Sequence, residues 1–170
     1  ASLVGGPIIE NNNFFNNSRP IWVQSSYPEF SNNQIEGNQW DGIVVKGLKL
    51  NRDYTLGGGP ASPAGGSVFI NYDEIPFWSI VVPEGIILTI EPGTIIKSVY
   101  STSGLIIEGT LIAEGTSEEP IVFTSFYDDE YGGDTNGDGD KAEYCRTKDP
   151  DDNTYPNCPR AGFWGQIVFT

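Results

Sequence analysis

The sequence predicts an all-β fold, a parallel β-helix (β-solenoid) with a long acidic loop insertion. Short apolar runs of three to six residues, rich in β-branched and aromatic side chains, are bounded by Gly, Pro and Asn. In the first part of the chain these runs recur about every 21 residues, the length of one solenoid turn. Helical periodicity is nowhere sustained, and 21 Gly with 12 Pro would interrupt helices throughout. Because such short strands cannot bury their inner faces alone, equivalent strands are expected to pair one coil apart, about 4.8 Å distant.

The first segment, residues 1–54, is predicted to form Asn-rich coils. "PIIENNNFFNN" (7–17) aligns with "PEFSNNQIEGN" (28–38) at a spacing of 21 residues. Just beyond, "PIWV" (20–23) recurs as "GIVV" (42–45) after 22 residues. The spacing predicts that these segments are equivalent turns of one solenoid.

The repeated Asn pairs are predicted to occupy the corners of these coils. Asn11 and Asn12 align with Asn32 and Asn33. Asn tolerates the left-handed backbone of a sharp corner, and stacked Asn side chains can form a hydrogen-bonded ladder. The alternative is a set of generic polar loops, which does not explain the register.

A Gly/Pro/Ser stretch at residues 55–67 is expected to be a flexible connector between the first coils and a second set at 68–170. In the second set, "LTIEPGTIIK" (88–97) aligns with "LIIEGTLIAE" (105–114) after one deletion. This alignment pairs Leu88 with Leu105, Ile90 with Ile107, Thr94 with Thr110 and Ile95 with Leu111. Two further strands, "PIVFT" and "GQIVFT", resemble each other.

An acidic insertion at residues 126–162 carries a predicted Ca²⁺ site. Asp134, Asn136, Asp138, Gly139 and Asp140 match the first half of the calcium-loop pattern D-x-[DN]-x-[DN]-G. Position twelve of such a loop would be Cys145 instead of the usual Glu, so the remaining ligand is expected from Glu143, Asp128 or Asp129. The expected role of the ion is to rigidify the insertion. A solvated acidic loop without an ion is the alternative.

Cys145 and Cys158 are the only cysteines and both lie in the Pro- and Asp-rich part of the insertion. The simplest expectation is a disulfide, and therefore an oxidising, extracytoplasmic environment. Two free thiols, or half of a zinc site, are the alternatives. A zinc site would have to use carboxylates, because the chain has no His.

Several segments resemble one known family. "VVPEGIILTIEPGTIIK", "LIIEGTLIAEGTSEEPIVFTS" and "GFWGQIVF" resemble the right-handed, pectate-lyase-like parallel β-helix domains of secreted and cell-surface bacterial and archaeal proteins. "NNNFFNNSRPIWVQSSYPEFSNNQIEGNQWDGIVV" is similar to the later, Asn-rich coils of these domains. The resemblance implies right-handed coils and a surface or secreted location. It implies no particular activity, since the architecture carries lyases, hydrolases, adhesins and inert stalks.

The order of these segments departs from the family, where Asn-rich coils come after the opening motif. The chain is therefore interpreted as the end of one solenoid, a connector and the start of another. A last strand without a polar cap would offer an edge to another chain. Either the segment continues a longer tandem array, or Ile167 and Phe169 contact Ile8 and Ile9 of a neighbouring copy in a head-to-tail fibre.

Composition excludes several partners and reactions. With 9 basic and 23 acidic residues the net charge is −14, which disfavours nucleic acids and anionic membranes. No apolar run is long enough to span a bilayer, so no membrane insertion is expected. Without His, Ser-His and Cys-His nucleophile activation is unavailable. Scattered basic residues show no lyase signature, and no pair of carboxylates is marked as the pair of a hydrolase.

Carbohydrate binding is the main alternative to a purely structural role. Exposed aromatic side chains stack on sugar faces, and Trp40, in a turn beside Asp41 and Gly42, is the candidate ligand-binding residue. A sequon at Asn16 is a candidate glycosylation site on a turn. The sequence thus predicts a non-enzymatic extracellular module that builds a surface filament, stalk or adhesin with itself as partner, and a glycan-binding module as runner-up.

Overall fold

The computed structural model describes residues 6–57, 67–72, 80–100, 102–139 and 164–170, and every regular element in these ranges is a strand. The strands are β1 (Ile8–Glu10), β2 (Asn13–Phe14), β3 (Ile21–Gln24), β4 (Glu29–Ser31), β5 (Gln34–Ile35), β6 (Ile43–Lys46), β7 (Tyr54–Leu56), β8 (Ser67–Asn71), β9 (Ile80–Val82), β10 (Ile87–Ile90), β11 (Thr94–Ser98), β12 (Leu105–Ile107), β13 (Thr110–Ala113), β14 (Val122–Ser125) and β15 (Ile167–Phe169). The prediction of an all-β chain is confirmed.

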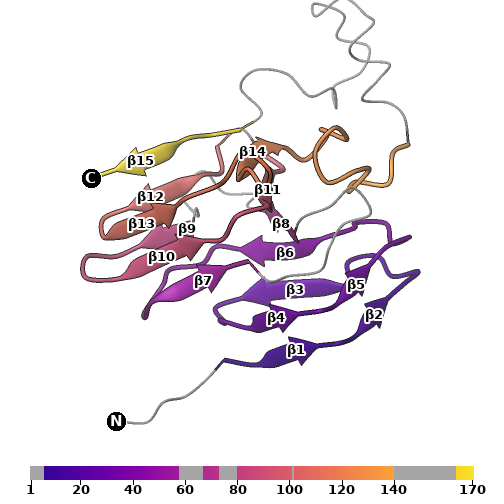
Figure 1. The fold of residues 1–170 in the computed structure, drawn as a ribbon, viewed down its shortest axis with the longest axis horizontal. Coiled ribbons are helices and arrows are strands. Elements are labelled where there is room, and N and C mark those ends of the chain that lie inside the picture. Colours follow the sequence, from indigo (N-terminus) through magenta and orange to yellow (C-terminus); the bar gives the residue numbers. More distant parts are fainter. Residues whose placement is uncertain (1–5, 58–66, 73–79, 101, 140–163) are drawn as a thin grey trace, which may run out of the picture.

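Every pair of described strands is parallel and joins equivalent strands of neighbouring coils (Figure 1). The longest ladder is a five-stranded sheet in the order β14-β11-β8-β6-β3. Two three-stranded sheets, β13-β10-β7 and β15-β12-β9, form other sides, together with the pairs β1-β4 and β2-β5. We number the coils 1 (β1–β3), 2 (β4–β6), 3 (β7–β8), 4 (β9–β11), 5 (β12–β14) and 6 (β15). This is the predicted parallel β-helix.

The core is a set of interior rows that run along the solenoid. Alternate residues of a strand face opposite sides of the sheet, so residues in register share one face through all coils. Val82, Ile107 and Phe169 form one such row, because β9, β12 and β15 pair in that register. Val82 and Ile107 are buried, at 0% and 2% exposure, whereas Phe169 in the last coil is 69% exposed. In this row, a side chain is buried only where coils lie on both sides of it.

The predicted Asn corners are confirmed. Asn11 and Asn32 have φ angles of 57° and 51°, in the left-handed region that Asn tolerates. One position later, Asn33 accepts hydrogen bonds at Oδ1 from the backbone N–H (3.1 Å) and the Nδ2 (3.2 Å) of Asn12, and its own Nδ2 donates to the Ile9 carbonyl (2.7 Å). Asn38 accepts bonds from Asn17 in the same way. Side-chain amides therefore join the corners of coils 1 and 2.

The register predicted within the second half is wrong. Leu88 pairs with Leu111, 23 residues on, and not with Leu105. Leu105 instead pairs with Ile80, so that its strand belongs to a different side of the solenoid. The predicted pairs Ile90–Ile107, Thr94–Thr110 and Ile95–Leu111 fail for the same reason, since each coil here contributes three strands of similar composition. The similar segments "PIVFT" and "GQIVFT" likewise lie in different sheets.

The two sets of coils form one continuous stack, which corrects the interpretation of two solenoids. β6 pairs with β8 across the predicted connector, and β7 pairs with β10. The pairing of Ile43 with Phe69 and of Leu56 with Ile90 keeps the interior rows continuous. Residues 58–66 of the predicted connector lie outside the described ranges. Pairing of β6 with β8 buries the inner faces of both strands. This gain does not depend on the length of the segment that connects the two sets of coils.

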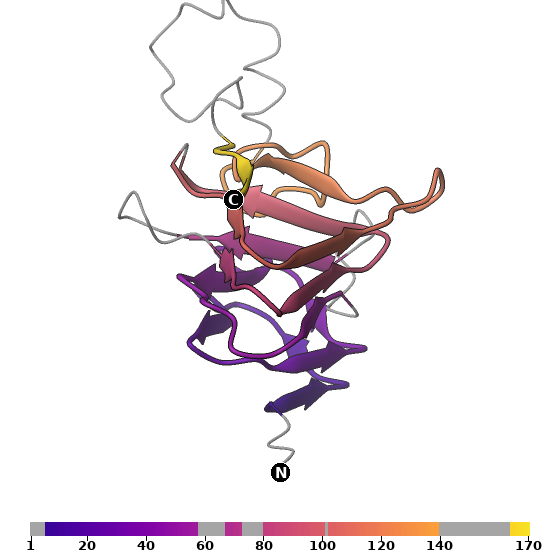
Figure 2. The same cartoon turned by 90° about the vertical axis from the view of Figure 1, so that its left-hand side faces the viewer.

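The coils widen along the stack (Figure 2). Between coils 1 and 2, paired residues are 21 or 22 apart, as in Ile9 with Phe30 and Ile21 with Ile43. In the later coils the spacing is 27 for Ile95 with Val122 and 25 for Ile80 with Leu105. The solenoid is therefore narrow at its N-terminal end, and its cross-section changes between coils 2 and 3.

We expect Asn33→Ala to lower the free energy of unfolding by about 1–3 kcal/mol, because Asn33 is 2% exposed and its loss would leave the Ile9 carbonyl and the Asn12 N–H of coil 1 without these bonds. Chemical denaturation measures the difference. Asn13→Ala is the matched control, since this neighbouring Asn is exposed. Equal stabilities of the two variants would contradict a structural role for the ladder.

Candidate functional site

The described part of the predicted insertion, residues 126–139, is a strap that packs on the outer face of the five-stranded sheet. It leaves β14 in coil 5 and reaches back as far as coil 2, where the Asp41 N–H donates to the Thr135 carbonyl (2.9 Å). Gly132 lies so close to the sheet that a Cβ there would be 2.8 Å from Val68 Cγ2, and a Cβ on Gly137 would be 2.8 Å from the Gln39 carbonyl oxygen. The strap thus connects coils that do not pair with each other.

A second apolar cluster lies beneath and beside the strap. Phe126 is buried against Trp40, with ring centroids 4.6 Å apart, and Trp40 also contacts Tyr72 at 5.6 Å. The Arg19 guanidinium lies 4.3 Å from the Trp40 ring centroid. Trp40 therefore packs within this cluster and is half-buried. Its predicted role in glycan binding would have to use the exposed part of the ring.

Lys97 anchors the strap to β11. Its side chain is fully buried, and Nζ donates to the Asp128 carbonyl (2.6 Å), the Gly133 carbonyl (3.0 Å) and the Thr135 hydroxyl (2.7 Å). Burial lowers the pKa of Lys97 from its usual 10.5 to about 8, against the opposing effect of nearby carboxylates, first among them Asp129. A buried cation with all three donors used can hold this segment in one conformation.

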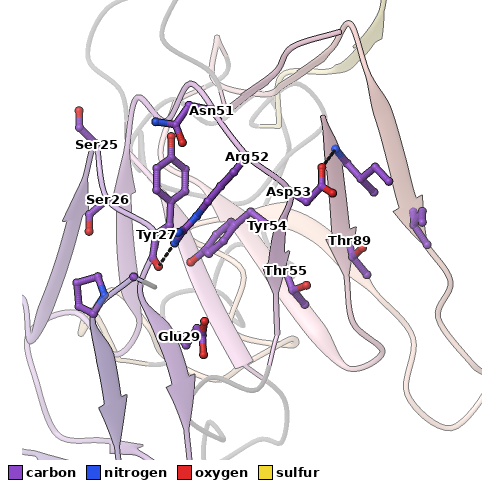
Figure 3. Close-up of a pocket in the computed structure, with 14 residues that line it drawn as sticks. Ser25, Ser26, Tyr27, Glu29, Asn51, Arg52, Asp53, Tyr54, Thr55 and Thr89 are labelled. Carbon is purple, nitrogen blue, oxygen red and sulfur yellow. Dashed lines mark hydrogen bonds between the residues drawn. The ribbon is translucent and has the colours of Figure 1, made fainter. Parts of the chain in front are cut away.

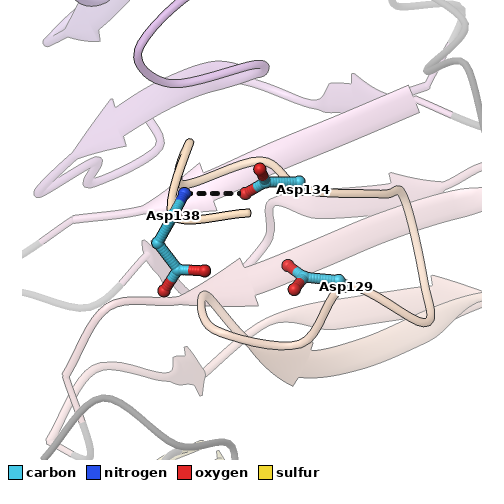
Figure 4. A group of neighbouring side chains, drawn as sticks. All are labelled: Asp129, Asp134 and Asp138. Atoms are coloured by element: carbon cyan, nitrogen blue, oxygen red, sulfur yellow. Dashed lines mark hydrogen bonds between the residues drawn. The ribbon is translucent and has the colours of Figure 1, made fainter. Parts of the chain in front are cut away.

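Three carboxylates of the strap converge (Figure 4). One oxygen from each of Asp129, Asp134 and Asp138 lies within 4.8 Å of the other two. Two oxygens on one Ca²⁺ are at most about 5 Å apart, because each Ca–O distance is about 2.3–2.6 Å. The Asp134 carboxylate also accepts the N–H groups of Asp138 and Gly139, which curls the backbone around it. The donor set and spacing fit a hard divalent cation.

The sequence-predicted ligands are only partly brought together. Asp134 and Asp138 are in the cluster, and its third member is Asp129, which was one of three alternatives for the missing ligand. The carboxylate of Asp128 instead accepts bonds from the Thr124 hydroxyl and the Glu130 N–H. Asn136 bonds to Asp138 within the loop through both side-chain atoms.

Four predicted site residues lie outside the described ranges: Asp140, Glu143, Cys145 and Cys158. Their roles as metal ligands and as a disulfide stay predictions. Asn16 is described, and it lies exposed at a corner with φ 57°, so glycosylation there also stays a prediction.

A groove with a volume of about 1100 Å³ lies on the side of the solenoid formed by β4, β7 and β10 (Figure 3). Its lining comes from coils 1 to 5 and includes Tyr27, Arg52, Tyr54 and Thr55. Arg52 donates to the Tyr27 carbonyl (3.3 Å), and the Asp53 carboxylate accepts the Ile87 N–H (2.8 Å). Neither the groove nor Lys97 was predicted from the sequence. No sequence signal marked the groove.

The two ends of the stack expose interior residues. Ile9 is in register with the buried Phe30, and Ile167 with the buried Leu105, yet both are only partly buried. Ile8 pairs with the exposed Glu29, and by alternation its side chain lies on the outer face. Of the four residues predicted to mediate self-assembly, Ile9, Ile167 and Phe169 belong to interior rows.

Comparison with known proteins agrees with this geometry. Residues 2–53 match a family described as "Right handed beta helix region". The chain carries a right-handed β-helix. The matched residues are coils 1 and 2, and the parallel ladders continue the same β-helix through the later coils. No curated protein and no solved structure matches the chain. Among the described residues there is no helix long and apolar enough to span a membrane.

We expect the buried ammonium of Lys97 to make stability depend on pH in metal-free protein. Because the folded-state pKa of about 8 is below the usual 10.5, the unfolded chain binds more protons between these values, and the free energy of unfolding should rise with pH in that window. The rise should approach about 1 kcal/mol per pH unit and be absent in Lys97→Met. Urea denaturation at pH 8 to 10 in chelator measures it. Parallel pH curves for the two proteins would contradict the assignment.

Proposed function

We propose that the β-helix is a non-enzymatic structural module of an extracellular surface filament, stalk or adhesin, in which coils stack within or between chains. The observation that carries this proposal is the interior row Val82, Ile107 and Phe169, which is buried in coils 4 and 5 and 69% exposed in coil 6. A further coil would cover Phe169 and pair with the outer edge of β15. Burying apolar surface contributes about 25 cal/mol per Å², so one added coil gains from the hydrophobic effect as well as from pairing.

The N-terminal end offers a complementary surface. Ile9 and Phe14 face the interior and are only partly buried, because no described coil lies before them. The ladder amides of Asn12 and Asn17 lie at the same end. Their Nδ2 groups already donate within coil 1 and to coil 2. In coil 2 the Asn33 Oδ1 accepts the backbone N–H and the Nδ2 of Asn12 from the coil before it, so the Asn12 Oδ1 is placed to accept such groups from an added coil. A neighbouring copy or another part of a longer chain would satisfy both ends.

We further propose that Ca²⁺ binds to the carboxylates of Asp129, Asp134 and Asp138 and fixes the strap. Three like charges this close repel each other, and one ammonium group, that of Lys97, compensates only part of that charge within the described part of the chain. A divalent cation would remove the repulsion and stabilise the only described segment that joins coil 5 to coil 2. The role is structural, because the ion would rigidify a clamp instead of polarising a substrate.

Calcium is expected to raise the melting temperature of the wild type and to slow proteolysis between Asp128 and Arg160, because it binds only the folded strap. Differential scanning calorimetry and limited proteolysis, with calcium and with excess chelator, measure both effects. Asp134→Asn should lose most of the calcium response, while Glu84→Gln, an exposed carboxylate on a distant turn, should keep it. Identical melting curves with and without calcium would refute the metal site.

Association of the purified chain is expected to grow with concentration and to depend on the open end. Phe169→Glu should reduce it at least about tenfold, since a charge would have to be buried in the new interface. Tyr131→Ser, which removes an exposed aromatic ring from the strap, away from the end of the stack, is the control. Light scattering and electron microscopy distinguish the species. A wild type that stays monomeric at all concentrations in calcium would refute stacking between copies.

A further inference from the structure

One side of the solenoid has a break in its ladder. β1 and β4 form a two-stranded sheet, and β7, β10 and β13 form a three-stranded sheet above it (Figure 1). Among the described strands, none joins β4 to β7. The same two coils are directly paired on another side, where β6 and β8 are in register. Coils 2 and 3 therefore diverge on the side of β4 and β7.

The edges that face this break carry backbone groups available for pairing. In a parallel ladder, successive residues direct their N–H and C=O to opposite sides. Glu29 donates to Pro7 in coil 1, so the next residue, Phe30, faces the break. Leu56 accepts from Glu91 in coil 4, so Thr55 faces the break from above. Phe30 and Thr55 make no backbone hydrogen bond toward each other in the described structure.

On this side, side-chain hydrogen bonds join the two coils, and no backbone ladder connects the described strands. The Tyr54 hydroxyl donates to the Pro28 carbonyl (2.8 Å), and the Tyr27 hydroxyl donates to the Lys49 carbonyl (2.9 Å). Arg52 reaches the Tyr27 carbonyl from coil 3. All three bonds cross from coil 2 to coil 3 by a side chain that is longer than the spacing of about 4.8 Å between paired strands.

We propose that this break is a docking site for an extended polypeptide, which adds as a strand to the free edge of β7. The groove of about 1100 Å³ opens at this edge, with Thr55 and Tyr54 in its lining (Figure 3). A peptide strand offers N–H and C=O groups at the spacing that the Thr55 edge requires. The side chains of Glu29 and Asp53 lie in the same groove beside the single cation of Arg52, so the fitting peptide is neutral or basic.

The test uses a fluorescein-labelled heptapeptide of alternating Thr and Val with a Lys at each end, and fluorescence anisotropy measures its binding to the whole chain. Thr55→Pro removes the one N–H that faces the break, and it keeps the N–H groups of Tyr54 and Leu56 that face β10. Thr55→Val is the matched control, since it changes the side chain and leaves the edge intact. A peptide N-methylated at alternate residues tests the same bonds from the ligand side, independently of how well Thr55→Pro folds.

Saturable binding to the wild type and to Thr55→Val is expected, with binding to Thr55→Pro and of the N-methylated peptide weaker by about tenfold or more. The Thr55 amide should exchange with solvent faster than those of Tyr54 and Leu56, and the peptide should protect it. Absence of saturable binding, or equal binding of the N-methylated peptide, would overturn the proposal. So would binding of neutral oligosaccharides in place of the peptide, or protection of Thr55 that rises with protein concentration alone, which would identify a second copy as the occupant.

Discussion

Each strand of this protein pairs with an equivalent strand in the coil before it, in the coil after it, or in both. This parallel pairing between equivalent positions brings interior side chains into continuous rows, such as Val82 with Ile107 and Phe169. It also brings the corners into register, so that one Asn can bond the backbone of the coil beneath. Local sequence sets each corner, but burial comes only from the neighbouring coil. Wherever pairing stops, apolar rows or backbone edges are exposed.

The strap is the described segment that departs from this nearest-neighbour arrangement. In a solenoid, stability is close to a sum of terms from adjacent repeats, so end coils can separate without disturbing the middle. The strap contacts Val68 in coil 3 and Asp41 in coil 2 and is bound at Lys97 in coil 4. Opening any junction between coils 2 and 5 therefore also disturbs the strap. The strap is attached through the buried ammonium of Lys97 and carries three converging carboxylates. We therefore expect metal ions and pH to change how stably the strap is attached.

The sequence was sufficient for the fold class and for the first two coils. Their spacing of 21 residues and their Asn pairs are local signals, because the corner conformation is a property of the Asn residue itself. The register of later coils was not predictable in the same way. Leu88 and Leu105 are in similar apolar runs, and which run pairs with which depends on the lengths of the intervening segments and on burial.

In the candidate sites, too, local sequence signals were predictive and features set by the three-dimensional stack were not. The alternating Asp134, Asn136 and Asp138 marked the acidic loop, but the choice of Asp129 over Asp128 depends on the backbone path after β14. Lys97 occurs in an apolar strand, where a lone Lys indicates an exposed position unless the covering segment is known. The groove could not be predicted, because it arises from a mismatch between coils that is a property of the three-dimensional stack.

The taper of the molecule gives any fibre built from it a polarity. A narrow first coil placed on a broad last coil leaves an overhang at every junction. The diameter of such a fibre would therefore change abruptly once per subunit. The two directions along the axis would then differ in shape as well as in chemistry. Because the two ends of such a fibre present different surfaces, subunits need not add to them at the same rate.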